Sequence, residues 1–190
     1  MLDTSIKYLT TAELEAGLDM IREAPKDLGV LELIVRRPGI EKRETLLEGE
    51  LHPLEGLVGD NWKHRGSSRT PDGSAHPNMQ LNIMNSRVIA LLAQDKERWP
   101  LAGDQLYVNM DLSAENLPVG TKLSIGSAQV EVSPEPHTGC RKFVARFGME
   151  AMKFVNSPLG RELNLRGINA RVVQAGLIRV GDQVRKIPLL

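Results

Sequence analysis

Cys140 is the only cysteine of this 190-residue sequence, and its neighbours are of types that could make it reactive. It lies in the segment Pro-Glu-Pro-His-Thr-Gly-Cys-Arg-Lys-Phe, with His137 three residues before it and Arg141 and Lys142 directly after it. Nearby cations and a helix N-terminus favour the thiolate form of a cysteine, and the Thr-Gly dipeptide could cap a helix that begins near Cys140. A free cysteine is also often a small buried apolar residue. The local residues leave both interpretations open.

The longest stretch without a predicted element is the loop 59–78, and its composition is typical of an anion site. The loop carries cations and hydroxyls against only two carboxylates, Asp60 and Asp72. Guanidinium groups, hydroxyls and the backbone amides of a glycine-rich turn suit a phosphate or another oxyanion. Long loops in compact domains are often functional, although a solvated surface loop would have the same composition. The residues concerned are Lys63, His64, Arg65, Ser67, Ser68, Arg69 and Thr70.

Other chemistries find little support in the sequence. The four histidines and the cysteine lack the spacing of metal ligands, so we do not expect a structural zinc site. No glycine-rich dinucleotide motif or P-loop motif is present. Asp111, Glu115 and Glu131 could be interpreted as acid–base pairs, but their spacing does not distinguish them from surface charges.

The composition is that of an ordinary globular chain with balanced charge. Hydrophobic residues make up 41% of the sequence, and 24 lysines and arginines balance 24 aspartates and glutamates. This balance argues against a nucleic-acid partner and means that any anion site must be local. One cysteine fits a reducing compartment. Because we find neither a signal-peptide pattern nor a membrane-length apolar run, we expect a cytoplasmic protein with no membrane partner.

Hydrophobic periodicity predicts many short strands and a few helices. We expect helices near 11–23, 86–95 and 140–155, the first with a capping box between Thr10 and Glu13. The strands do not alternate regularly with helices, so a doubly wound parallel sheet is not expected. A mainly β fold, with mostly antiparallel strands in a closed or nearly closed barrel and attached helices, fits better. The segments that read as strands are 29–39, 42–53, 78–85, 104–112, 120–126, 128–134, 167–176 and 182–187.

An ordered series of segments resembles the MOSC domain family, named after the C-terminal domain of molybdenum cofactor sulfurase. The segment 114–120 is similar to the family's Glu-Asn-Leu segment, and 123–143 is similar to its Ile-Gly hairpin and signature cysteine. The closing segment 167–184 and the Gly-Asp segment 56–66 resemble two further family segments. The resemblance implies a MOSC-type β-barrel over residues 51–190. Residues 1–50, with the N-terminal helix and first strands, are either part of the same domain or an extension, and we expect a single domain overall.

The resemblance also implies a molybdenum cofactor, that is, a metal held by a pterin. Carried over by position, Cys140 would hold sulfur or bind the metal, with His137 as a second catalytic residue. The loop 63–70 would lie near the cofactor phosphate. The expected cofactor contacts are Arg65, Ser67, Ser68, Arg69, Asn116, Arg141, Lys142, Arg166 and Arg171.

Three functions remain open at the level of sequence. In the first, Cys140 carries sulfur or transfers it to the cofactor, which needs an accessible thiolate and a sulfur-donor partner. In the second, the thiolate binds molybdenum in a small reductase of N-hydroxylated substrates, which needs an external reductase. In the third, the protein binds the cofactor without catalysis. Pyridoxal phosphate enters only as an association of the family; we recognise no pyridoxal-phosphate domain in this sequence, so we expect sulfur to come from elsewhere.

Overall fold

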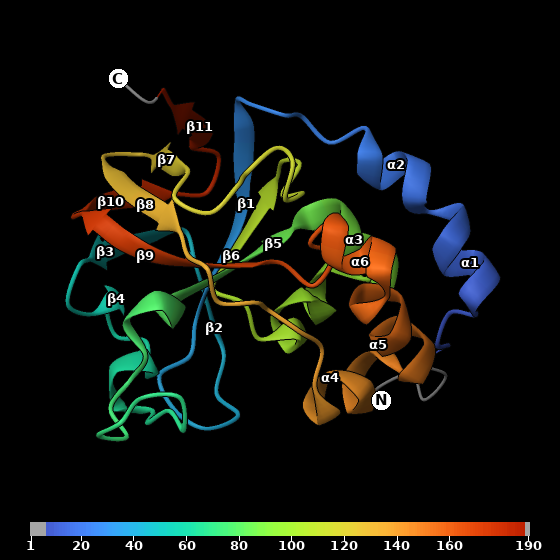
Figure 1. The fold of residues 1–190 in the computed structure, drawn as a ribbon, viewed down its shortest axis with the longest axis horizontal. Helices are drawn as coiled ribbons and strands as arrows, with labels where there is room; N and C mark the ends of the chain where they lie inside the picture. The colour runs from blue at the N-terminus through green and yellow to red at the C-terminus, as the bar shows by residue number, and fades with distance from the viewer. Residues whose placement is uncertain (1–6, 189–190) are drawn as a thin grey trace.

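A β-barrel organises the computed structural model, which describes residues 7–188 (Figure 1). Seven strands close the barrel in the order β1-β11-β7-β8-β9-β5-β6, and β6 pairs again with β1. Within residues 7–188, β5 and β6 form the only parallel pair of the barrel. The predicted fold class is therefore confirmed. The barrel strands are β1 (Gly29–Arg36), β5 (Leu81–Asn85), β6 (Leu106–Asn109), β7 (Lys122–Ile125), β8 (Ala128–Val132), β9 (Ile168–Gln174) and β11 (Gln183–Ile187).

A small second sheet lies beside the barrel. It consists of β10 (Gly176–Arg179), β3 (Glu48–His52) and β4 (Gly56–Leu57), while β2 (Glu44–Leu46) extends the barrel at β1. The sequence did not predict β4 or β10, because each is short and neither contains a clear hydrophobic alternation. β10 exists because its residues pair with β3, more than a hundred positions earlier in the chain.

Strand β1 separates the two hydrophobic cores of the molecule. Leu31 and Ile34 point into the barrel, whereas Leu33 and Val35 belong to a second core between the barrel wall and the helices. A bulge between Leu31 and Leu33 makes this arrangement possible, because without it these two side chains would share one face of the strand. One strand therefore supports both the barrel and the helical layer.

The α-helices cover one side of the barrel (Figure 1). Five of the six α-helices among the described residues fall in the predicted segments, whereas the helix Pro158–Glu162 was not predicted. The segment predicted at 11–23 is divided at Gly17, where an added Cβ would lie 2.5 Å from a methyl carbon of Leu91. The segment predicted at 140–155 is divided at Gly148, whose φ of +89° favours glycine. The α-helices are α1 (Thr11–Ala16), α2 (Leu18–Arg22), α3 (Ser86–Ala93), α4 (Arg141–Phe147), α5 (Met149–Asn156) and α6 (Pro158–Glu162), and the 3-10 segments are η1 (Trp62–His64), η2 (Pro77–Met79) and η3 (Lys96–Ala102).

Two aromatic residues attach α4 to the second core. Phe143 and Phe147 are each 2% exposed, and their ring centroids lie 4.9 Å apart. Since Cys140 directly precedes α4, these two rings also determine where the cysteine lies.

We predict that Phe147→Ala lowers the free energy of unfolding by about 3–5 kcal/mol, because it removes a buried ring and leaves a cavity. Urea unfolding followed by circular dichroism measures the change. Met149→Ala, at a half-exposed position two residues later, is the control and should cost no more than about 0.5 kcal/mol. Similar losses in both variants would contradict a core role for Phe147.

Candidate functional site

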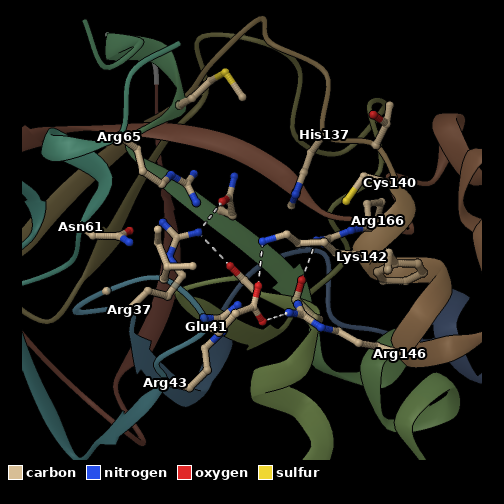
Figure 2. A pocket seen from close by; sticks show the side chains of 18 residues that line it. Arg37, Glu41, Arg43, Asn61, Arg65, His137, Cys140, Lys142, Arg146 and Arg166 are labelled. Carbon is tan, nitrogen blue, oxygen red and sulfur yellow. Dashed lines mark hydrogen bonds and ion pairs between the residues drawn. The ribbon is translucent and has the colours of Figure 1, made fainter.

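A pocket of about 270 Å³ brings Cys140 together with six cationic side chains (Figure 2). Its walls come from the segment after β1, the segment around η1, the end of η2 with β5, and the end of η3. The segment before α4, α4 itself and the segment before β9 complete them. These segments are far apart in sequence and are joined by the barrel. The cations are Arg37, Arg43, Arg65, Lys142, Arg146 and Arg166.

Cys140 is the N-cap residue of α4, and its side chain is exposed at the pocket. The residue before it is held from α5: the Gly139 amide donates to Asn156 Oδ1 at 2.8 Å, and Asn156 Nδ2 donates to the Gly139 carbonyl at 3.2 Å. The buried Phe143 fixes the helix on the other side of the cysteine. The thiol is therefore accessible on a backbone that is held at both ends.

Two buried ion pairs form the floor of the pocket. Arg37 donates to both carboxylate oxygens of Asp60 at 2.9 Å, and Arg166 donates to both oxygens of Asp104 at 2.7 and 3.0 Å. Each guanidinium also donates to a backbone carbonyl, Arg37 to that of Gly103 and Arg166 to that of Ala102. Arg37 binds the two oxygens through two different nitrogens, and this bidentate arrangement fixes its guanidinium. Arg166 contacts both Asp104 oxygens through Nη1 alone.

The outer cations of the pocket are compensated much less. Within residues 7–188, neither Arg43 nor Arg65 has a carboxylate partner; Arg43 donates to two backbone carbonyls instead. Partial burial lowers the pKa of both guanidinium groups, and neighbouring arginines lower it further. Lys142 and Arg146 share one carboxylate, that of Glu41. The pocket therefore carries an excess of positive charge.

Three residues that line the pocket have buried polar atoms without a hydrogen-bond partner among the described residues. These atoms are Asn61 Oδ1, His137 Nδ1 and Arg166 Nε. His137 Nδ1 lies 3.4 Å from a carboxylate oxygen of Asp104 but does not form a well-directed hydrogen bond with it. Buried polar atoms are normally paired. Donors and acceptors left open beside excess positive charge fit a polar, anionic ligand.

Burial sets the protonation state of His137. Loss of solvent lowers the pKa of the imidazole well below its ordinary value of 6.5, and the positive charges of Arg166 and Arg37 lower it further. His137 is therefore neutral at pH 7 and can accept or donate a hydrogen bond without adding charge to the pocket.

The pocket does not contain a ready-made metal site. Among residues 7–188, no group of three or more His, Cys, Asp or Glu side chains is placed to hold a metal ion. The thiolate of Cys140 is a soft ligand of the type that suits a transition metal. A metal here would therefore arrive within a larger cofactor that supplies its other ligands.

Five of the residues singled out in the sequence line this pocket: Arg65, His137, Cys140, Lys142 and Arg166. The remaining loop residues do not. Arg69 donates to Glu135 at 2.8 Å, Ser67 Oγ accepts from the amide of Arg69, and Ser68 is exposed outside the pocket lining.

The other three predicted contacts also lie outside the pocket lining. Arg171 pairs with Glu131 across β8 and β9 on the barrel surface. Asn116 donates to the carbonyls of Lys26 and Asp111, and therefore ties two loops together. Arg141 is exposed on α4.

Sequence reasoning missed six residues that shape the pocket: Arg37, Glu41, Arg43, Asn61, Asp104 and Arg146. A weak signal existed for one of them, because Asp60, the partner of Arg37, belongs to the Gly-Asp segment that resembles the family pattern. Asn61 lies in the same segment. For the remaining residues, no local feature distinguishes a charged residue of the pocket from one on the surface.

Comparison with known proteins identifies the family. Residues 72–185, more than half of the chain, match the MOSC domain. This chain belongs to the MOSC domain family. MOSC domains are associated in general with the molybdenum cofactor. Part of the pocket lies outside the matched region, since Arg37, Arg43 and Arg65 precede residue 72.

Several solved structures share this MOSC fold. The YUAD protein from Bacillus subtilis matches with a TM-score of 0.59 and 16% identity, over 86% of this chain and 98% of that one. YiiM from Escherichia coli matches with a TM-score of 0.55 and 18% identity, over 85% of this chain and 71% of that one. A hypothetical protein matches with a TM-score of 0.58 and 19% identity, over 90% and 71% of the two chains. At these identities the likeness concerns the fold alone. Among curated proteins, none matches the sequence significantly.

Among the described residues, no helix has the length and apolar character needed to cross a bilayer.

We predict that His137 makes the protein less stable as the pH falls below about 6.5. The unfolded chain then binds a proton on this imidazole that the folded state excludes, so unfolding is favoured by up to about 1.4 kcal/mol per pH unit. Urea unfolding of the wild type and His137→Gln, from about pH 7.5 to about pH 5.5, measures the difference in slope. His64→Gln, at an exposed position, should keep the wild-type dependence. Parallel curves for wild type and His137→Gln would contradict the prediction.

Proposed function

We propose that this MOSC protein binds the phosphorylated pterin of the molybdenum cofactor in the arginine-lined pocket and uses Cys140 as its sulfur-carrying group. The observation that supports this most directly is the presence of an accessible thiol and six cationic side chains in one pocket. A surface cysteine alone would not indicate a cofactor, and a cationic pocket alone would not indicate sulfur chemistry.

The outer cations are suited to the cofactor phosphate. Among residues 7–188, Arg43 and Arg65 have no carboxylate partner, so a phosphate can bind their guanidinium groups without breaking an ion pair of the described structure. The open atoms of Asn61, His137 and Arg166 offer hydrogen bonds to the polar edge of a pterin. When bound, the cofactor supplies molybdenum and its sulfur and redox chemistry; the residues of this chain bind it and exclude water.

The sulfur-loading step can be written for this chain and a donor persulfide, R–S–SH. The Cys140 thiolate attacks the outer sulfur, a new S–S bond forms on Cys140, the S–S bond of the donor breaks, and R–S⁻ leaves with the electron pair. The exposure of Cys140 supports this role, because a donor must reach the sulfur atom.

A second function has one observation in its favour. Cys140 not only is exposed but also lines the pocket, so its thiolate is placed to be a lasting ligand of a bound metal. In that case the protein is a small molybdenum reductase that receives electrons from an external reductase. The two functions differ in whether Cys140 gains sulfur or remains bonded to molybdenum.

We predict that Arg65→Ala weakens binding of the molybdenum cofactor by roughly 10- to 100-fold, because one charge-assisted contact to the phosphate is lost. Arg65→Lys should recover only part of the affinity, since an ammonium group cannot bind two phosphate oxygens in one plane. Titration of the cofactor into each variant, followed by tryptophan fluorescence, gives the dissociation constants.

Arg69→Ala is the matched control for Arg65→Ala. It removes the same side chain from the same loop, but Arg69 pairs with Glu135 outside the pocket lining. We expect a smaller effect than for Arg65→Ala. Equal affinity in Arg65→Ala and the wild type, with circular dichroism unchanged, would exclude Arg65 from the phosphate site.

Cys140→Ser distinguishes the two functions. For sulfur carriage, intact-protein mass spectrometry after incubation with a persulfide donor should show one added sulfur atom on the wild type and none on the variant. For a lasting metal ligand, the wild type purified from a cofactor-producing host should contain molybdenum and pterin in equal amounts, and the variant should lose the metal. A wild type that gains no sulfur and holds no cofactor would contradict both functions.

A further inference from the structure

The pocket contains an ion-pair cluster that the proposed function leaves unexplained. Glu41 accepts hydrogen bonds from Lys142 at 2.7 Å and from Arg146 at 2.7 Å, across about a hundred residues of sequence. In Figure 2 its carboxylate lies within the pocket, with dashed lines to both cations. The two cations lie four residues apart on α4 and therefore share one face of the helix that follows Cys140.

Arg146 is held more firmly than Glu41. The Arg146 side chain is 18% exposed and also donates to the Leu101 carbonyl at 2.7 Å, so it keeps its position without Glu41. The Glu41 side chain is 55% exposed and lies on the segment after β1, with a left-handed φ of 58° that is unusual for a residue other than glycine. Compared with Arg146, Glu41 is therefore the partner that can move away from the ion pair at the lower cost.

Another observation points to a ligand in the same pocket. Arg166 lines this pocket, is 6% exposed, and its Nε has no hydrogen-bond partner among the described residues. A buried guanidinium nitrogen without a partner is a donor held ready for an acceptor that enters the pocket. The Glu41 carboxylate already binds Lys142 and Arg146, so the carboxylate of a ligand would fit the same two cations.

We propose that Lys142 and Arg146 form an oxyanion subsite beside Cys140 for a small, carboxylate-bearing sulfur donor, and that Glu41 occupies this subsite until the donor displaces it. The inference rests on the proposed sulfur-carrying function and narrows the class of donor. The donor is a low-molecular-mass persulfide, and the exchange is the one written above: its outer sulfur passes to Cys140, and its remaining thiolate leaves. Its carboxylate replaces that of Glu41.

Two alkylating reagents test the subsite without cofactor or sulfur donor. Iodoacetate carries a carboxylate and iodoacetamide does not, while both form the same C–S bond with Cys140 and release iodide. The ratio of their rates cancels any change in the fraction of thiolate, because both reagents attack the same sulfur atom. Each ratio is divided by that of a free small thiol in the same buffer.

We expect Glu41→Gln to raise the iodoacetate-to-iodoacetamide ratio by about threefold or more, because the competing carboxylate is gone. Lys142→Gln and Arg146→Gln should each lower the ratio by about threefold. The control is Glu48→Gln, which removes a carboxylate on β3 that pairs with the exposed Arg179 on β10, and it should leave the ratio unchanged. If Glu41→Gln changes both rates equally, or neither, the proposal is overturned.

A second measurement tests the donor class. Persulfides of mercaptoacetate and of its uncharged amide are compared for sulfur loading of Cys140 by mass spectrometry. The proposal requires faster loading from the carboxylate and a further gain in Glu41→Gln; equal rates from both donors would contradict it. If neither donor loads the wild type, the sulfur-carrying function fails, while the alkylation ratios still report separately on the subsite.

Discussion

The buried ion pair between Arg166 and Asp104 is the constraint on which the rest of the pocket depends. Burial raises the pKa of the Asp104 carboxyl, and the Arg166 guanidinium acts in the opposite direction. Neither group is tolerated alone in this position, because an unpaired buried charge is strongly destabilising. The pair joins the segment before β6 to the segment before β9, and His137 packs directly against it. The floor of the pocket is therefore fixed before any ligand enters.

The pocket separates cations that support structure from cations that are available for binding. Arg37 and Arg166 each pair with their own buried carboxylate and form the fixed floor of the pocket. Among the described residues, Arg43 and Arg65 have no carboxylate partner, and Lys142 and Arg146 share a single carboxylate, that of the exposed Glu41. An anionic ligand restores the balance of charge in such a pocket. That requirement, rather than any single residue, is what supports the proposal of an anionic cofactor in this pocket.

Features with a local physical cause were predictable from the sequence. The capping box of Thr10 and Glu13 forms as expected, the hairpin between β7 and β8 turns at the Gly126-Ser127 pair, and α4 begins directly after Cys140. The barrel itself followed from many short strands that do not alternate with helices, and the ordered motifs of 114–143 and 167–184 pointed to the MOSC family. Composition also marked Arg65 within the loop 59–78, but it could not distinguish Arg65 from Arg69.

Only the tertiary structure decided which residues share the pocket. Closure of the barrel brings the segments after β1, around η1 and before β9 to α4, and no sequence spacing encodes these distances. Arg37 and Arg146 are indistinguishable from surface arginines until the fold gives one of them a buried aspartate and the other a shared glutamate. Likewise, β10 becomes a strand because β3 offers it a hydrogen-bonding edge. The sequence alone determined that α4 starts next to Cys140 with cations beside it, because a helix start and local charge depend on a few residues; the N-cap is Cys140 itself and not the expected Thr-Gly pair. Charge pairing and burial act across the whole chain, so the fold decided which other cations reach the cysteine.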